Sequence, residues 1–265
     1  MRYGGNTTCL EIRPVSGPVI VVDAGSGIRN LGKMLAQERG TSAIRFLFTH
    51  AHWDHLSGFP FFGPAYSPAN TLTFCSGPHA EASIRKYLSR QMEAPYFPVD
   101  MSALKAHFVY RCERPNQEPG NCCLGSVQVS QIPISHPNGG YGFKFMERGK
   151  VFVFLTDNEL GYQHPGGLNR AKYLEFCRNA DLLFHDAQYT DEEYQATRGW
   201  GHSTYTDVTD FAIESGAKNL VLFHHDPDRT DEDLDRQVEN CCRRIRRAGA
   251  ALECVAAAEG MAFDL

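Results

Sequence analysis

The chain has 265 residues, of which 42% are hydrophobic and 22% are charged, and its formal net charge is −5. This composition excludes an intrinsically disordered chain, which would be poorer in apolar residues. A mildly acidic chain has no global attraction to nucleic acid. No apolar run reaches the roughly 20 residues of a membrane helix, and the first residues have no apolar stretch of the signal-peptide type.

The nine cysteines are odd in number, include two adjacent pairs and form no C-x-x-C motif. A chain of this length can bury a core without disulfides. We therefore expect a cytoplasmic protein with mostly buried thiols. Because no linker, repeat or low-complexity tract interrupts the sequence, we expect one domain over residues 1–265.

The first half of the chain shows apolar runs separated by turn residues. Strands are expected at 9–13, 19–22 and 44–49, and helices at 28–38 and from Gly77 to about Met92. Residues 93–123 contain four prolines and are expected to be irregular. Such a segment fits a lid over a site equally well as a surface excursion or a dimer contact.

The second half repeats this alternation. Strands are expected at 127–134, 141–146, 151–155, 181–184 and 219–223, and helices at 168–178, 206–215 and 234–248. Alternating strands and helices in both halves predict an α/β protein with two packed sheets and helices outside.

Five expected strands end in a side chain that can bind a metal or move a proton. These residues are His50, His136, Asp157, Asp186 and His224. Sheets deliver polar groups to one rim in this way, and binding sites lie on the loops there. Asp23 also ends a strand, in a glycine-rich loop, and either supports a metal-bound histidine or caps its own turn.

The densest motif is Thr49-His50-Ala51-His52-Trp53-Asp54-His55, directly after a buried strand. Imidazole and carboxylate suit zinc, manganese or iron. The absence of thiolate from this motif argues against a closed structural zinc site. If the turn curls back, two of its residues can face one ion and two can face a second.

His50-x-His52-x-Asp54-His55 resembles the signature of the metallo-β-lactamase-fold hydrolases, and the resemblance covers nearly the whole chain. It implies a four-layer αββα sandwich, with two mixed sheets flanked by helices. It also implies two divalent metal ions, of which zinc is expected and manganese or iron are alternatives. By analogy with the family, His50, His52 and His136 bind one ion, Asp54, His55 and His224 bind the other, and Asp157 bridges them.

The segment Gly201-His202-Ser203-Thr204, together with His185-Asp186, resembles the tRNase Z-like and cyclic phosphodiesterase branch of this family. The resemblance implies that His202 is a general acid for the departing alkoxide and that Asp186 orients it. We assign catalytic roles to His202, Asp186 and Asp54. A histidine that caps the following helix is the alternative for His202, and a strand-end cap is the alternative for Asp186.

The expected reaction is hydrolysis of a small phosphodiester, such as a cyclic nucleotide, by water activated at the metals. The tRNase Z family carries a long tRNA-gripping arm between the positions of His136 and Asp157, and this interval has room only for a pair of strands. Because of this short interval and the negative net charge, we do not expect nucleic acid as a partner. The absence of a long apolar run likewise gives no reason to expect a membrane as a partner. A homodimer is common in the family that the chain resembles.

Two other functions stay open at this point. The same metals could serve a thioester, lactone or β-lactam hydrolase, or the chain could be a metal- or nucleotide-binding module without turnover. His225 is a second choice for the position of His224, because adjacent residues of a strand face opposite sides. His79, His107 and His164 are expected to be surface or packing residues. Members of this branch begin with an additional strand; because the sequence starts at Met1-Arg2-Tyr3, either this first strand is missing or the chain is a shortened form.

Overall fold

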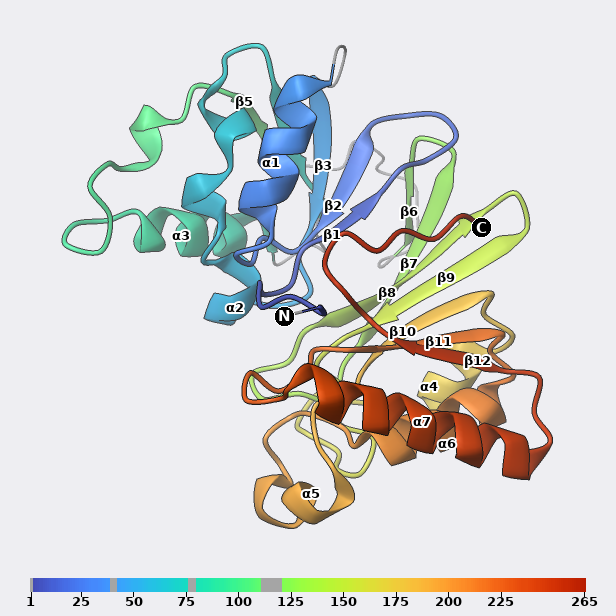
Figure 1. Cartoon of the computed structure of the whole chain (residues 1–265). Helices are drawn as coiled ribbons and strands as arrows, with labels where there is room; N and C mark the ends of the chain where they lie inside the picture. Colours follow the sequence, from blue (N-terminus) through green and yellow to red (C-terminus); the bar gives the residue numbers. More distant parts are fainter. Residues whose placement is uncertain (1, 39–41, 76–79, 111–120) are drawn as a thin grey trace. The chain divides into compact units, whose positions relative to one another are not determined.

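The structure is a computed structural model that describes residues 2–38, 42–75, 80–110 and 121–265 (Figure 1). The chain forms two compact units. The N-terminal unit is Asn6–Val129, and the C-terminal unit consists of Met1–Gly5 and Ser130–Leu265. That the two units make up one domain stays a prediction.

The N-terminal unit is built on a five-stranded sheet with the order β1-β2-β3-β4-β5. Its strands are β1 (Leu10–Ile12), β2 (Val19–Val22), β3 (Ala43–Leu47), β4 (Thr71–Phe74) and β5 (His107–Val109). β1 runs antiparallel to β2, and the other neighbours are parallel, so the sheet is mixed.

Helices α1 (Ile28–Gln37) and α3 (Ala80–Gln91) pack against this sheet (Figure 1). α1 buries Ile28, Leu31 and Leu35, which recur at the spacing of one helix face. This unit also contains the short helix α2 (Trp53–Leu56) and three 3₁₀ turns, η1 (Phe59–Phe61), η2 (Gly63–Tyr66) and η3 (Met101–Ala103). Phe46 of β3 contacts the rings of Phe59, Phe62 and Phe74, so α2 is followed by a segment anchored in the core.

The second sheet has the order β12-β11-β10-β9-β8-β7-β6, and the boundary of the units falls within β7. Its strands are β6 (Asn121–Leu124), β7 (Val127–Pro133), β8 (Tyr141–Glu147), β9 (Lys150–Leu155), β10 (Leu182–Asp186), β11 (Asn219–Phe223) and β12 (Glu253–Ala256). β9, β10, β11 and β12 are parallel, whereas β8 is antiparallel to β9. Asp157, Asp186 and His224 therefore lie at the carboxyl ends of the neighbouring parallel strands β9, β10 and β11.

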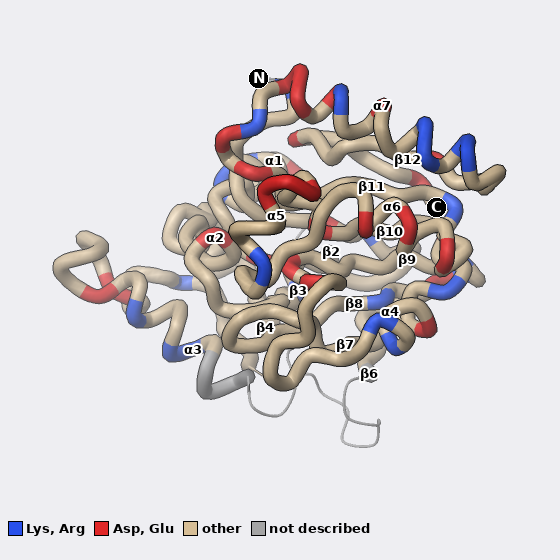
Figure 2. Tube along the Cα trace, turned by 90° about the horizontal axis from the view of Figure 1, so that it is seen from below, with Lys and Arg blue, Asp and Glu red and all other residues tan. Residues whose placement is uncertain are grey.

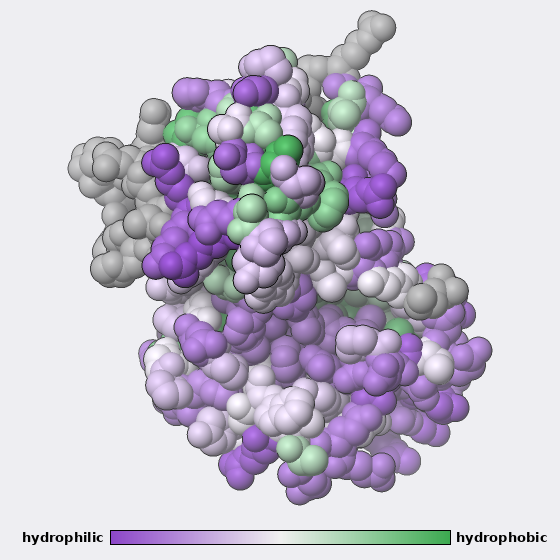
Figure 3. Space-filling model, turned by 90° about the vertical axis from the view of Figure 1, so that its left-hand side faces the viewer, coloured by the Kyte–Doolittle hydropathy of each residue, from purple (hydrophilic) through white to green (hydrophobic). Residues whose placement is uncertain are grey.

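Four helices belong to the C-terminal unit: α4 (Arg170–Cys177), α5 (Asp191–Thr197), α6 (Tyr205–Ser215) and α7 (Asp231–Ala248). α4, α6 and α7 bury apolar residues against β7, β9, β10 and β11. α7 is acidic in its first turn and basic in its last turn (Figure 2), which complements the dipole of the helix. In Figure 3, hydrophobic residues gather on the N-terminal unit, and the C-terminal unit is mostly hydrophilic on that face.

Two mixed sheets with helices confirm the predicted α/β class. The expectation of irregular structure over 93–123 is wrong in part, because β5 and the start of β6 lie there. β4, β12 and α5 are not predicted from the sequence. Gly77, at the expected start of a helix, Cys112 and His79 lie outside the described residues.

Of the eight described cysteines, four are buried and four are partly buried. Within the described ranges, no helix combines the length and the apolar character that a bilayer span requires. The cytoplasmic location stays a prediction.

Candidate metal centre

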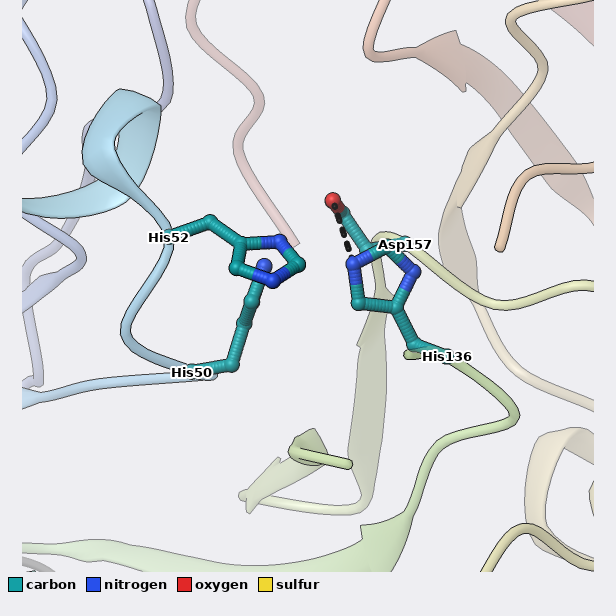
Figure 4. A group of neighbouring side chains, drawn as sticks. All are labelled: His50, His52, His136 and Asp157. Atoms are coloured by element: carbon teal, nitrogen blue, oxygen red, sulfur yellow. Dashed lines mark ion pairs between the residues drawn. The ribbon is translucent and has the colours of Figure 1, made fainter. Parts of the chain in front are cut away.

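In the N-terminal unit, the loop after β3 and the helix α2 gather four candidate ligands. The His50 ring lies 4.5 Å from that of His52 and 4.2 Å from that of His55, between centroids (Figure 4 shows the first pair). His52 precedes the first turn of α2, and Asp54 lies within that turn. Nε2 of His55 lies 3.1 Å from Oδ2 of Asp54. Three imidazoles and one carboxylate thus converge within six residues.

A completely buried carboxylate, Asp23, fixes this loop from the end of β2. Its Oδ1 accepts the N–H of Thr49 at 2.8 Å, and its Oδ2 accepts the Thr49 hydroxyl at 2.7 Å and Nδ1 of His55 at 2.8 Å. Burial raises the pKa of Asp23 above its usual range, and its donors oppose this shift. Because Nδ1 of His55 is held in this way, Nε2 is the nitrogen that is available to a metal ion.

The loop of Asp23 approaches α2 too closely for side chains at two positions. A Cβ atom on Gly25 would lie 2.2 Å from the carbonyl oxygen of Asp54, and one on Gly58 would lie 2.0 Å from that of Gly25. Ala24 donates its N–H to the carbonyl of His55 at 2.7 Å. Gly25 and Gly58, which have no side chain, therefore allow the loop of Asp23 to lie close to the loop that carries the histidines.

In the C-terminal unit, Asp157 lies between two histidines. Its Oδ2 is 3.6 Å from Nε2 of His136, marked by the dashed line in Figure 4, and its Oδ1 is 3.5 Å from Nε2 of His224. His136 follows β7, Asp157 follows β9 and His224 follows β11. Each oxygen of the carboxylate thus faces a different imidazole.

Acceptors behind both imidazoles determine their orientation. Nδ1 of His136 donates to the carbonyl of Gly201 at 2.9 Å, and Nδ1 of His224 donates to Oε1 of Gln188 at 3.2 Å. These contacts leave the lone pair on Nε2 of each ring, directed at Asp157. Metal-bound histidines are usually held by such an acceptor on the other nitrogen.

Three of the strand-end residues have left-handed backbone conformations: φ is +62° at Asp23, +51° at Asp157 and +55° at His224. Residues with a Cβ rarely adopt this region, and such conformations cluster at functional sites. At the end of each of these strands, a polar side chain is therefore placed in the candidate site by a turn whose backbone conformation is strained.

His202 lies against the C-terminal ligands and is held by Asp186. Its Nδ1 is 2.8 Å from Oδ2 of the completely buried Asp186, at the end of β10. The ring stacks on His224 with centroids 4.9 Å apart and meets His136 edge-on at 5.2 Å. Nε2 of His202 is the nitrogen that can hold or release a proton toward a bound substrate.

The residues after His202 fasten its loop. The Ser203 hydroxyl donates to the carbonyl of Asn158 at 2.7 Å and accepts the N–H of Leu160 at 3.0 Å. The Thr204 side chain caps α6 by accepting the N–H of Asp207 at 3.1 Å. Because Thr204 is the cap of this helix, His202 is not needed for capping.

His225 faces away from Asp157. Its Nε2 donates to the carbonyl of Ala257 at 3.1 Å, and its ring meets that of Tyr3 edge-on. Burial lowers the pKa of His225, which favours a neutral imidazole. Of the two adjacent histidines, the structure places His224 beside the carboxylate.

One buried carboxylate near the site is not predicted from the sequence. Glu159, two residues after Asp157, accepts Nε2 of His164 at 2.8 Å and also binds the segment before His202. The sequence predicts that His164 is a surface or packing residue, and the structure shows the second: it is buried in this hydrogen-bond network. His107, in contrast, is exposed on β5.

The donor sets of both units fit divalent metal ions. Two tetrahedral ligands of one zinc ion lie roughly 3.3–3.5 Å apart when their bonds are about 2.0–2.1 Å long. The separations of Asp157 from His136 and His224 are close to this value. The His/Asp clusters are thus compatible with two divalent ions. The roles of the individual residues stay predictions.

Comparison with known proteins places the chain in a family. The profile of the family described as "Beta-lactamase superfamily domain" matches residues 19–225. A protein named ribonuclease Z from Brevibacillus brevis is 39% identical, with 82% of this chain and 79% of that protein covered.

Solved structures show the same fold. The metallo-β-lactamase fold protein YhfI from Bacillus subtilis has a TM-score of 0.66 at 17% identity, and the match covers 99% of this chain and 96% of that one. A diphosphatase from the PhnP family has a TM-score of 0.63 at 17% identity, covering 98% and 85%. The predicted metallo-β-lactamase fold is therefore confirmed. The chain belongs to the beta-lactamase superfamily and, within it, to the metal-dependent hydrolases that resemble ribonuclease Z.

Proposed function

We propose that the protein hydrolyses a phosphodiester, with His202 as the general acid. The observation that carries this proposal is the pair formed by His202 and the buried Asp186, stacked on the candidate ligand His224. A phosphodiester needs charge neutralisation on its oxygens and a proton for its leaving group. An acyl hydrolase with a good leaving group has less need of such an acid.

The proposal includes the division of ligands between two ions. One ion would be held by His50, His52 and His136, and the other by Asp54, His55 and His224, with Asp157 shared by both. When bound, two such ions neutralise the phosphoryl oxygens and lower the pKa of water. Membership of the superfamily and the donor chemistry of each unit support this division. Zinc is the proposed metal, since imidazole and carboxylate donors suit it, with manganese and iron as alternatives.

The side chains of the protein supply the remaining chemistry. Asp186 accepts Nδ1–H of His202, which leaves Nε2 as the site of the transferable proton. The proton passes from Nε2 to the departing alkoxide oxygen, and the neighbouring carboxylate stabilises the protonated ring before transfer. Asp54 is proposed to orient the attacking water in addition to its role as a ligand.

A small phosphodiester such as a cyclic nucleotide is the proposed substrate. Between His136 and Asp157 the chain forms only β8 and β9, joined by a tight turn, so this interval holds no long arm. The structurally similar diphosphatase supports chemistry on phosphorus. A cytoplasmic homodimer stays part of the proposal.

RNA is the second candidate substrate, because the 39% identical relative is named ribonuclease Z. This name weighs against the expectation that nucleic acid is not a partner. A cavity of about 420 Å³ between α6 and α7 supports the second candidate, since Arg243, Arg244 and Arg247 line it. Guanidinium groups bind phosphate oxygens well.

The test is turnover by zinc- or manganese-loaded protein of bis(p-nitrophenyl) phosphate, of 2′,3′- and 3′,5′-cyclic nucleotides, and of a precursor tRNA. Hydrolysis of a cyclic nucleotide supports the small-substrate proposal. Cleavage of the tRNA alone, weakened by Arg247→Glu, supports the second candidate. No hydrolysis of any phosphodiester, with activity on S-lactoylglutathione or a lactone instead, would overturn the proposal. Nucleotide binding without any product would indicate a binding module.

A further inference from the structure

The turn before His202 presents an exposed tryptophan between two glycines. Trp200 is 63% exposed, although tryptophan is usually among the most buried residues on average. Gly199 and Gly201 have φ values of +87° and +99°, which residues with side chains rarely adopt. The residues on both sides of Trp200 thus have positive φ values, which only glycine adopts at little energetic cost.

A buried carboxylate holds both of these glycines. Glu159 is 1% exposed. Its Oε1 accepts the N–H of Gly199 at 2.7 Å, and its Oε2 accepts the N–H of Gly201 at 2.8 Å. The two amides that flank Trp200 are therefore fixed by the two oxygens of one side chain.

Two further donors hold Glu159 itself. The Tyr194 hydroxyl donates to Oε1 at 2.6 Å, and Nε2 of His164 lies 2.8 Å from Oε2. A carboxylate with four donors from three segments cannot rotate freely. The backbone of the loop that carries Trp200 is consequently tied to two other segments although its central side chain is exposed.

The same turn is part of the candidate metal centre. A Cβ atom on Gly201 would lie 2.1 Å from Nδ1 of His136, and the Gly201 carbonyl accepts that nitrogen. Trp200 is two residues from His202, so their Cα atoms are at most about 7.6 Å apart. The backbone of an exposed aromatic residue is thus held within two residues of the proposed general acid.

Further groups of the same unit suit an aromatic, anionic ligand. Tyr162 is 43% exposed, and its ring meets that of His164 edge-on at 4.8 Å. The guanidinium of Arg198, next to Gly199, lies 5.8 Å from the centre of the Tyr162 ring. Single exposed apolar residues are ordinary on protein surfaces. A buried carboxylate that fixes both flanking amides distinguishes Trp200 from such a residue.

We propose that Trp200 is a stacking platform for a nucleobase on the leaving-group side of the scissile phosphodiester. The leaving-group side follows from the neighbouring His202, which protonates the departing oxygen; to this extent the inference rests on the proposed function. The substrate class is then a nucleotidyl phosphodiester and not an alkyl one. Base stacking on an aromatic side chain is independent of base identity.

Binding tests this inference separately from catalysis. The sequence contains only two tryptophans, so Trp53→Phe leaves Trp200 as the single tryptophan fluorophore. On the leaving-group side the product is a nucleoside with a free hydroxyl, so adenosine is the probe, and ribose, which carries a hydroxyl group in place of the base, is its control. We expect adenosine to quench the Trp200 emission and ribose at the same concentration to leave it unchanged. An equal response to both ligands, or none to either, would overturn the inference.

Kinetics give the second readout, with adenylyl-adenosine and an analogue that lacks the leaving-side base. Trp200→Ala is expected to raise KM for adenylyl-adenosine about 5- to 150-fold, with little change in kcat and no change for the abasic analogue. Trp200→Phe should restore most of the affinity. Equal losses on both substrates would mean a structural role and would contradict the inference. Failure of the wild-type protein to cleave either substrate counts against the phosphodiesterase proposal alone, since the fluorescence result stands by itself.

Glu159→Gln tests whether the Glu159 carboxylate, through its bonds to the Gly199 and Gly201 amides, positions Trp200. The amide group of glutamine cannot accept at both positions, so the Gly199 and Gly201 amides lose one acceptor. We expect faster quenching of Trp200 by acrylamide and a weaker preference for adenosine over ribose. If the preference for the ligand that carries a base is unchanged, Glu159 does not position Trp200.

Discussion

Nδ1 of His202 lies 2.8 Å from Oδ2 of Asp186, and this carboxylate is completely buried. A proton on Nε2 of His202 increases the rate of hydrolysis only when the leaving oxygen has to be protonated. His202→Ala should therefore lower kcat about 10²- to 10⁴-fold for a nucleotide substrate with an alkoxide leaving group. Hydrolysis of bis(p-nitrophenyl) phosphate, whose leaving group departs without a proton, should change less than 10-fold by the same reasoning.

Asp186→Asn should show the same dependence on the leaving group with a smaller loss, because the ring stays near its position. His107→Ala, which removes an exposed histidine of β5, is the control and should behave like the wild type. Equal losses on both substrates in His202→Ala would argue against an acid role.

Asp157 is expected to determine how many ions the protein holds. Asparagine tolerates a left-handed backbone, so Asp157→Asn removes the charge without forcing a new turn. Since each oxygen of Asp157 faces a different histidine, the loss should affect both ions. We expect fewer than two ions per chain by elemental analysis. Asp210→Asn, at an exposed pair with Arg244, is the control and should keep the wild-type metal content.

Asp23 acts behind His55, so its removal should weaken metal binding without removing a ligand. Asp23→Asn keeps the size of the side chain but cannot accept from Thr49 and His55 in the same way. Losses of metal affinity of about 10- to 100-fold are typical for such supporting residues. Competition with a chelator measures this affinity. An unchanged affinity would mean that Asp23 only closes its turn.

His185 should make the stability of the metal-free protein dependent on pH. Burial lowers the pKa of this completely buried imidazole, and the smaller effects of Asp186 and Asp207 oppose the shift. In the unfolded chain His185 takes up a proton near pH 6.5, whereas in the folded chain it does so only at lower pH. Its contribution to stability is thus complete above pH 6.5 and is lost as the pH falls below that value.

The slope from one such group is at most about 1.4 kcal/mol per pH unit. Urea unfolding between pH 8 and 5, with chelator present, should show a steeper loss for the wild type than for His185→Gln. Parallel curves would contradict this assignment.

The sequence predicts well those elements that carry their own signal. The strands at 19–22 and 219–223 have the predicted bounds, because each is a continuous apolar run between turn residues. His224 and His225 contact different groups, but His224 lies beyond the end of β11 and has a left-handed backbone, so the alternation of strand residues does not explain this difference. The metal motif after β3 is local, so its residues necessarily lie close together.

Features that depend on distant residues are not predictable in this way. Glu159 gains its role only through donors at His164, Tyr194, Gly199 and Gly201, and no local pattern brings these together. α5 buries no residue and so has no apolar face, although its capping box of Thr190 and Glu193 is a signal that could have revealed it. β12 has only four residues and depends on its parallel partner β11.

The left-handed conformations of Asp23, Asp157 and His224 connect metal supply to the amount of folded protein. Each costs on the order of 1 kcal/mol relative to a relaxed turn. Ions that bind only the folded chain offset this cost by mass action. Starvation for metal should therefore lower the cellular abundance of the protein, through unfolding and degradation, before it limits turnover of the molecules that remain.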